Sequence, residues 1–286
     1  MSSSDTSESA AVGHISIIGR IGIYAGLTVA AAIMAFPFLF SFMTAFKTPK
    51  DFATHSPFAL PEAWTLENFS TILGGEHNFG AAIITTLLVV IVMVIGQVTS
   101  SVFAAYAFAR LQFPGRDLIF WLFLSTMMIP ATVLVIPLYL MMAKMGMNNT
   151  FWGIVIPFMF ASPYAVFLLR ESFRGIPQDI IDAARLDGAG PVKILTRIVA
   201  PMSTPILATL TLITVVSQWN SFMWPRIIAN QHPQMITVAT ATLQTQYNAN
   251  WTLVMAATTL ALVPLIIVFL LFQKQIVGSI ALTGMK

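Results

Sequence analysis

The sequence has no cysteine and few charged residues, and each shortage excludes a class of protein. Without cysteine, these 286 residues form no disulfide, no thiol nucleophile and no thiolate metal site. Charged residues make up 9% of the chain, against roughly 25% in a soluble domain. A chain so poor in charge cannot cover a surface that faces water, so its solvent is largely lipid. Its basic residues are spread between apolar blocks, which argues against a nucleic-acid-binding face.

Long apolar runs take the place of the missing charges. Hydrophobic residues make up 57% of the chain, and the mean hydropathy is +0.83. A helix that spans a bilayer needs about 20 mostly apolar residues, and lipid offers backbone amides no partner outside a helix. We therefore predict an all-α integral membrane protein with six transmembrane helices. The six uncharged runs are 21–46, 81–109, 118–143, 151–169, 202–224 and 251–272.

Lysine and arginine are divided unevenly between the loops, and cytoplasmic loops carry the excess. With a cytoplasmic N-terminus, the inside segments hold Arg20, Arg110, Arg116, Arg170, Arg174, Arg185, Lys193, Arg197, Lys274 and Lys286. The outside loops then hold only Lys47, Lys50, Lys144 and Arg226. We expect both termini in the cytoplasm, with tails at 1–20 and 274–286 around a transmembrane domain at 21–273. The first tail is Ser-rich and lacks a basic start, unlike a cleaved signal peptide.

Prolines interrupt the predicted spans. A proline removes a backbone donor and kinks or breaks a helix, although membrane helices commonly tolerate it. Several in one bundle suggest broken or curved helices around a cavity. The seven are Pro37, Pro130, Pro137, Pro157, Pro163, Pro205 and Pro264.

The segment 170–201, between the fourth and fifth runs, is too charged to span a bilayer and too regular for a plain loop. Its charged residues are Arg170, Glu171, Arg174, Asp179, Asp182, Arg185, Asp187, Lys193 and Arg197.

Turn and capping residues divide this segment into two short helices. Pro177 can begin the first helix, with Asp179 in its positive first turn. Gly188 can adopt the left-handed conformation that ends it. Pro191 can begin a second helix, which Pro201 ends. Two interpretations stay open: a rigid lever that docks on a soluble partner, and an amphipathic connector that lies on lipid headgroups.

This segment resembles the EAA motif in the permease subunits of bacterial ABC importers. Two positions differ from the usual pattern, because Asp182 stands in place of Glu and Ala200 in place of Leu. The aspartate keeps the charge with a shorter reach. The matching residues, which the resemblance implies couple the chain to an ATPase, are Asp182, Ala183, Ala184, Asp187, Gly188, Ala189, Ile198 and Pro201.

The resemblance extends over roughly residues 20–286. The stretches 103–115 and 218–225 are also similar to carbohydrate-importer permeases. The chain resembles in kind the smaller permease subunit of the maltose importer, and the trehalose and glycerol-phosphate importers have subunits of the same build.

The resemblance implies a multi-subunit importer in a bacterial inner membrane. It implies the type I permease fold, with a coupling helix between the fourth and fifth spans. A second permease, two ATP-binding subunits and an extracytoplasmic substrate-binding protein would complete the assembly. ATP and Mg would bind the partner ATPases, and this chain would be no enzyme and hold no cofactor. It contains no GxxxxGK[ST] phosphate loop. The expected cargo is a di- or oligosaccharide such as trehalose or maltose, or alternatively glycerol phosphate.

Polar residues inside or near the runs are the other candidates. Gln218, Trp219 and Asn220 can contact substrate or form a gate, or they can be an interfacial Trp with amides that bridge helices. Gln97, Thr99, Ser100 and Ser101 are more typical of helix–helix hydrogen bonds than of ligand contacts. The amide-rich segment 225–250 is either a loop that reaches substrate or a solvated loop. The four histidines lack metal-ligand spacing, so we predict no metal site.

Two other functional classes compete with the permease. An ion-driven secondary transporter often carries ionisable residues in its spans, and the six runs contain none. A membrane-embedded enzyme needs catalytic carboxylates or histidines at one membrane face. The acid-rich cluster of this sequence is the patterned segment 170–201.

Overall fold

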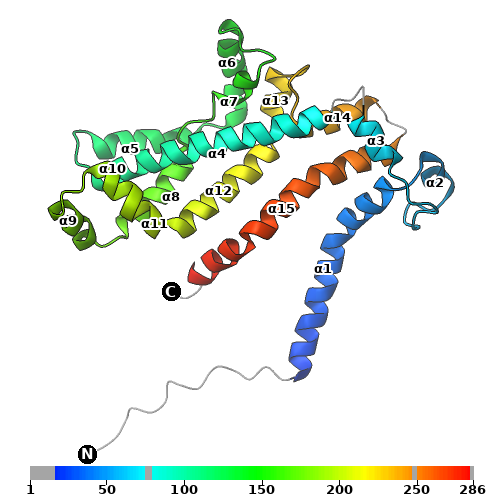
Figure 1. The fold of residues 1–286 in the computed structure, drawn as a ribbon, viewed down its shortest axis with the longest axis horizontal. Coiled ribbons are helices and arrows are strands. Elements are labelled where there is room, and N and C mark those ends of the chain that lie inside the picture. Colours follow the sequence, from blue (N-terminus) through cyan, green and yellow to red (C-terminus); the bar gives the residue numbers. More distant parts are fainter. Residues whose placement is uncertain (1–16, 75–78, 247–249, 284–286) are drawn as a thin grey trace, which may run out of the picture.

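The computed structural model describes residues 17–74, 79–246 and 250–283, and helices make up nearly all of its regular structure (Figure 1). This confirms the all-α class. The first helices are α1 (Ile17–Ala45), α2 (Pro49–Thr54), α3 (Glu67–Leu73), α4 (Phe79–Arg110), α5 (Arg116–Ser125), η1 (Thr126–Met128) and α6 (Ala131–Lys144). Next come α7 (Phe151–Val155), α8 (Pro163–Arg174), α9 (Gln178–Leu186), α10 (Pro191–Ile194), η2 (Leu195–Val199) and α11 (Ala200–Met202). The last are α12 (Thr204–Trp219), α13 (Met223–Ile228), α14 (Ile236–Gln246) and α15 (Trp251–Thr283).

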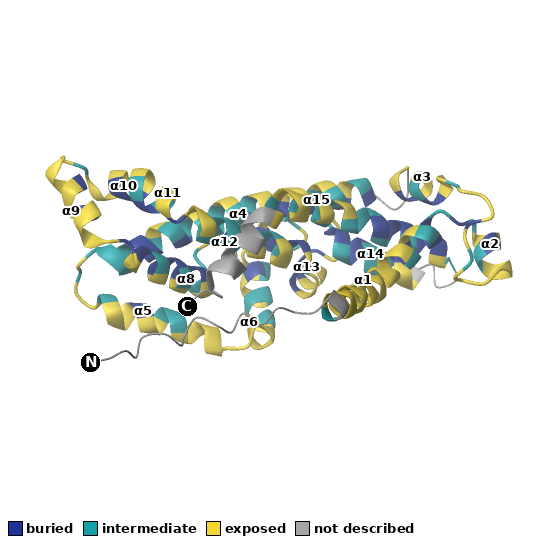
Figure 2. Cartoon of the chain, turned by 90° about the horizontal axis from the view of Figure 1, so that it is seen from below, coloured by how far each residue is buried: buried dark blue, intermediate teal, exposed yellow. Residues whose placement is uncertain are grey.

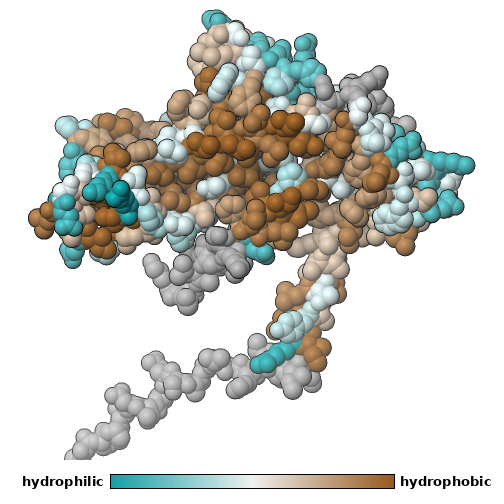
Figure 3. Space-filling view, viewed as in Figure 1, coloured by the Kyte–Doolittle hydropathy of each residue, from teal (hydrophilic) through white to brown (hydrophobic). Residues whose placement is uncertain are grey.

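Helix α4 lies at the centre of the bundle. It packs against α8 on one side and α12 on the other, and α15 packs against α12 and α14. A close approach at Gly96 requires glycine, because a Cβ there would lie 2.6 Å from the Met159 carbonyl oxygen. Apolar side chains cover much of this bundle in Figure 3, and hydrophilic residues gather towards its ends. That distribution fits a bundle whose sides face lipid.

Helix α1 leaves the bundle (Figure 1), and nearly all of its described residues are exposed (Figure 2). Only its C-terminal end is buried, where Ala45 joins a core with α15. There the Asn68 amide of α3 donates to the carbonyls of Ala45 and Lys47, both at 2.8 Å. The Asn68 carbonyl oxygen accepts from Thr252 of α15 at 3.1 Å. One buried amide therefore joins α1, α3 and α15.

Three helices of the described chain are long and apolar enough to cross a membrane. They are Gly19–Ala45, Phe79–Arg110 and Trp251–Gln273, and they coincide with the predicted runs 21–46, 81–109 and 251–272. Helix α15 then continues to Thr283, so most of the C-terminal tail expected at 274–286 is helical. A lysine ends an apolar run but does not end a helix. The tail expected at 1–20 lies largely outside the described residues.

The other three predicted runs are broken helices. In 118–143, α5 and α6 meet at 99° where Pro130 precedes α6. Run 151–169 is divided into α7 and α8, and run 202–224 contains α12 and the start of α13. A bend of 83° at Ser203 separates α12 from the helix before it. The described chain has up to five spans if each bent pair counts as one, so the six-span count stays a prediction.

Polar side chains of α4 stabilise the non-helical stretch between α7 and α8. The Gln97 amide donates to the Phe158 carbonyl at 3.4 Å, and its oxygen accepts from Thr214 of α12 at 3.3 Å. The buried Ser101 hydroxyl accepts from the Ser162 amide at 3.2 Å. Unwound backbone at membrane depth needs such partners. The helix-bridging interpretation of Gln97 and Ser101 agrees with these contacts.

The amide-rich segment 225–250, in the part at 225–246 that the structure describes, is more ordered than a solvated loop. It contains most of α13 and all of α14, and Met235, Ile236 and Val238 are fully buried. The Ile236 amide donates to the Thr86 hydroxyl of α4 at 2.8 Å. Amide-rich composition concealed an apolar stripe that packs α14 against α4 and α15.

Candidate functional site

Helix α9 forms the first half of the charged segment. Pro177 precedes it in an extended conformation, and Asp179 lies in its first turn. Gly188 follows its C-terminus with φ +76°, in the left-handed region. The Gly188 amide donates to the Arg185 carbonyl and the Ala189 amide to the Ala184 carbonyl, both at 2.9 Å. This paired bonding is a Schellman C-cap, so the turn expected at Gly188 is present.

The second half of the segment is one irregular helix. Pro191 begins α10, which passes through the π-helical turn η2 into α11. Pro201 has no N–H to donate to the carbonyl four residues earlier, and the wider π turn lies directly before it. The helix ends at Met202, one residue beyond the predicted end.

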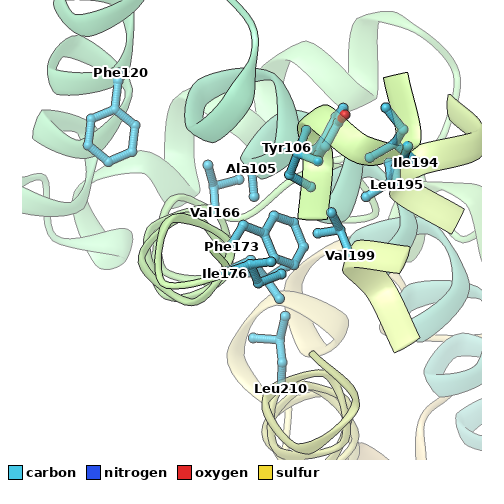
Figure 4. Close-up of a cluster of buried hydrophobic side chains, with 14 residues drawn as sticks. Ala105, Tyr106, Phe120, Val166, Phe173, Ile176, Ile194, Leu195, Val199 and Leu210 are labelled. Carbon is cyan, nitrogen blue, oxygen red and sulfur yellow. The ribbon is translucent and has the colours of Figure 1, made fainter. Parts of the chain in front are cut away.

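The EAA residues divide into an inner and an outer face. Ala184, Ala189 and Ile198 pack against a buried cluster beneath the segment. Figure 4 shows the centre of this cluster, where Phe173 and Ile176 meet side chains of η2 and α12. Burial of these apolar residues fixes the segment to α4 and α8.

The outer face of α9 is open to solvent. Asp182, Ala183, Asp187 and Gly188 are exposed, and Pro201 is exposed at the far end of the segment. A further residue, Leu186, is 90% exposed beside the Gly188 turn. Sequence reasoning missed it because the two positions between Ala184 and Asp187 carry no motif identity. Leu186 and the Gly188 turn together form the exposed tip of the segment.

Arg110, the last residue of α4, joins that helix to α9. Its guanidinium donates to the carbonyls of Phe173 and Ile176 at the end of α8. It also donates to the Gln178 side chain at 2.7 Å, and Gln178 donates to Asp182 at 3.0 Å. A chain of side-chain hydrogen bonds thus runs from the central helix to the EAA aspartate.

Arg170 makes a second connection at the same end of the bundle. It is 9% exposed, and its guanidinium lies 4.0 Å from the centre of the Phe120 ring of α5. It forms an ion pair with Glu171 at 2.9 Å and donates to the Phe108 carbonyl at 3.4 Å. Asp117 of α5 lies 3.7 Å from it. These contacts join α4, α5 and α8 at the start of the charged segment 170–201.

The three candidates at the end of α12 do not form one site. Trp219 is 3% exposed, and its indole N–H donates to the Ala261 carbonyl of α15 at 3.1 Å. It is therefore a helix-packing residue with little ring face for a sugar. Asn220 is exposed, and its amide donates to the Val216 carbonyl at 2.8 Å. Gln218 is partly exposed one position earlier, about 100° around the helix from Trp219.

Two pockets flank the turn at 220–222 that follows α12. One, of about 390 Å³, lies between α12, α14 and α15, and both Asn220 and the edge of Trp219 line it. The other, of about 610 Å³, is apolar and lies between α6, the start of α13 and the unwound stretch at Pro157. Phe222 lines both pockets. Non-helical backbone at membrane depth is typical of the wall of a cavity.

One histidine lies within a group of possible metal ligands, although the sequence predicts no metal site. Donor atoms of Asp51, His55 and Glu62 lie within 4.8 Å of one another. The buried Asp51 carboxylate already accepts from His55 at 3.0 Å and from the Glu62 amide at 3.1 Å. These bonds tie α2 to the loop that follows it. The group therefore has a sufficient structural role as a loop clamp.

Comparison with known proteins gives one consistent family. The model of the family described as "Binding-protein-dependent transport system inner membrane component" matches residues 97–281. The arabinooligosaccharides transport system permease protein AraQ of Halalkalibacterium halodurans is 29% identical, over 91% of this chain and 94% of its own length. The sn-glycerol-3-phosphate transport system permease protein UgpE of Yersinia pestis is 34% identical, over 77% of this chain and 80% of its own length.

A solved structure shares the fold. It is a bacterial ABC transporter involved in the import of the acidic polysaccharide alginate, and one of its chains matches with a TM-score of 0.78. The match covers 91% of this chain and 98% of that chain at 24% identity. The type I importer permease fold expected from the EAA segment is thereby confirmed.

Proposed function

Because this chain belongs to the family of inner membrane components of binding-protein-dependent transport systems, we propose that it forms half of the translocation pathway of a saccharide importer. It is a multi-pass permease subunit of an ABC transporter and not itself an enzyme. A binding protein delivers substrate to transporters of this family. The ion-driven transporter and the membrane enzyme are therefore set aside.

The observation that carries the energy-coupling proposal is the two-faced EAA segment. Its inner face is fixed to α4 and α8 by buried apolar contacts, and its outer face presents Leu186, Asp187 and Gly188 to solvent. A connector that lies on lipid headgroups would turn its apolar stripe to the lipid, whereas Ile181 and Ala184 of α9 are buried against the protein and its exposed face is largely charged. We infer that this outer face docks in a groove of an ATP-binding subunit.

The hydrogen bonds of Arg110 support transmission of that subunit's motion. Displacement of α9 pulls on Gln178, and Gln178 is bonded to Arg110 at the end of the central helix. Hydrogen bonds that involve a charged group contribute roughly 1.5–3 kcal/mol each. Such a linkage moves α4 and α9 together instead of letting α9 slide.

The proposed assembly contains a second permease, two ATP-binding subunits and an extracytoplasmic binding protein. ATP and Mg would bind the ATPase subunits, and this chain would hold no cofactor. The apolar side chains along α1 are exposed in the isolated chain and would face water without a neighbour. This exposure supports contact of α1 with lipid or with the second permease. The EAA segment on the inside agrees with both termini in the cytoplasm.

The proposed cargo is a di- or oligosaccharide, and trehalose or maltose stays a proposal. A relative named for arabinooligosaccharides covers nearly the whole chain, which supports an oligosaccharide. Glycerol phosphate is the second candidate, since the relative named for it has the higher identity of the two. Neither name assigns the substrate of this chain.

Affinity purification from native membranes tests the assembly. We expect an ATPase, a second permease and a binding protein to co-purify with the tagged chain. The complex is then placed in proteoliposomes and offered labelled maltose, trehalose, an arabinooligosaccharide and glycerol 3-phosphate. ATP-dependent uptake of one of them is the expected result. Recovery of the chain alone, with uptake driven by an ion gradient, would refute the proposal.

A further inference from the structure

The wall of the pocket between α12, α14 and α15 is mostly apolar, but it carries five hydroxyl or amide side chains, whereas the apolar pocket beside it has two, Thr132 and Ser221. Hydroxyl and amide groups of three helices converge on about 390 Å³, a volume at the small end of ligand sites. It lies where α12 stops and the backbone turns at 220–222. The polar groups that line it are Asn220, Thr237, Thr240, Gln244 and Thr258.

The internal hydrogen bonds decide what these groups can offer a ligand. A hydroxyl has one proton and two lone pairs. Thr237 donates its proton to the Ser221 carbonyl at 2.6 Å. Thr240 donates to the carbonyl four residues earlier at 2.8 Å, and Thr258 does the same at 2.9 Å. All three hydroxyls have used their protons, so they offer acceptor lone pairs.

The two amides complete a wall rich in acceptors. Asn220 uses one N–H in its own helix and keeps its carbonyl oxygen. Gln244 is exposed at the pocket edge and carries one acceptor and two donors. A ligand rich in O–H donors matches such a wall.

Charge decides which hydroxyl-rich ligand fits. None of the described residues that line the pocket is charged. The cation of α13, Arg226, donates to Thr242 at 3.0 Å, and neither residue lines the pocket. A phosphate or uronate in a low-dielectric pocket needs a cation or several N–H donors. The lining therefore favours a neutral ligand over an anionic one.

We propose that this pocket binds a sugar ring of a neutral saccharide during translocation, and this inference rests on the proposed importer function. Threonine hydroxyls and the Asn220 carbonyl accept from sugar hydroxyls, while Gln244 supplies donors. Phe222, 45% exposed, offers a ring face to the apolar side of the sugar. Phe222 also borders the apolar pocket, so the two pockets share this side chain.

The absence of cysteine makes a protection experiment direct. Gln244→Cys and the control Thr245→Cys each place a single thiol in this chain, at neighbouring exposed positions of α14. Only position 244 lines the pocket. The purified complex is labelled with a maleimide in the presence of maltose, trehalose, an arabinooligosaccharide, glycerol 3-phosphate or an alginate oligosaccharide. Labelling is read on this chain by mass spectrometry.

We expect a neutral saccharide that the complex transports to slow labelling at position 244. At ten times its half-saturating concentration, the rate should fall about tenfold, and the rate at position 245 should stay within about twofold. Adding Thr240→Val to the 244 variant removes one acceptor and should raise the half-saturating concentration about 3- to 10-fold.

Failure of the inference and failure of the proposed function give different results. ATP-dependent uptake of a neutral saccharide with no protection at position 244, or with equal protection at both positions, would overturn the pocket assignment alone. Uptake and protection by the anionic probes only would overturn neutral selectivity. A complex that takes up none of the probes with ATP would count against the importer function itself.

Discussion

Replacing Gly188 with valine tests the turn at the tip of the EAA segment. At φ +76° an L-residue costs roughly 1–2 kcal/mol, and a β-branched side chain lies at the upper end. A Cβ at this position meets no atom within 4 Å, so the cost is conformational and not a clash. A penalty of about 2 kcal/mol lowers the equilibrium constant between the native turn and its alternatives by about 30-fold.

Asparagine supplies the matched control, since it tolerates the left-handed conformation. In proteoliposomes we expect Gly188→Val to lower ATP-dependent uptake by about tenfold or more. Gly188→Asn should stay within about twofold of the unmodified complex. ATP hydrolysis should continue in the valine variant, because the ATPase subunits are intact. Unchanged uptake by the valine variant, or equal loss in both variants, would refute the reasoning.

Three further predictions concern the packing of the bundle. Gly96→Val should prevent recovery of folded chain, because a Cβ at this position lies 2.6 Å from the Met159 carbonyl oxygen. The control Gly80→Val should express normally, because a Cβ there meets no atom within 4 Å. Normal expression of both variants would contradict this. Arg110→Ala should lower both uptake and the melting temperature of the complex. Arg110→Lys should recover only part of each, because lysine cannot reproduce the separate hydrogen bonds of the two guanidinium nitrogens. Full recovery by lysine would mean that the positive charge alone matters. Trp219→Phe should lower stability by about 0.6–1 kcal/mol through loss of its hydrogen bond to α15. An unchanged melting temperature of the complex would contradict this.

Apolar length and capping residues predicted the parts of the fold that depend on local sequence. The runs at 81–109 and 251–272 form long helices, because a backbone surrounded by lipid can satisfy its hydrogen bonds only within a helix. The left-handed turn at Gly188 follows from glycine's freedom at positive φ. The EAA pattern gave the permease fold, which the structural comparison confirms.

The breaks could not be predicted because identical residue types behave differently in different packing. Pro37 and Pro264 lie inside continuous helices, whereas Pro130 and Pro163 begin new ones. Whether a helix breaks at a proline depends on whether other groups can bond to the backbone groups that the break leaves without a helical partner. Gln97 supplies one such partner beside Pro157, at the Phe158 carbonyl, and no local signal reveals a contact made 61 residues along the chain.

The candidate site was predicted in part for the same reason. Motif identity marked Asp182 and Gly188 but could not show that Leu186 is 90% exposed beside the turn. Trp219 was a candidate for sugar stacking by composition, and tertiary packing buries it against α15. The pocket residues Thr240 and Thr258 lie on different helices, so only the folded chain brings them together.

The most direct test of the energy-coupling proposal is a cross-link from the tip of α9. Leu186→Cys carries a thiol-reactive benzophenone in the purified complex, and Thr245→Cys in α14 carries the same probe as the control. After illumination, mass spectrometry identifies the partner attached to each position. We expect position 186 to attach to an ATP-binding subunit, with a yield that changes when ATP is added, and position 245 to attach to none. An ATPase adduct missing from position 186, or equal at both positions, would contradict the account.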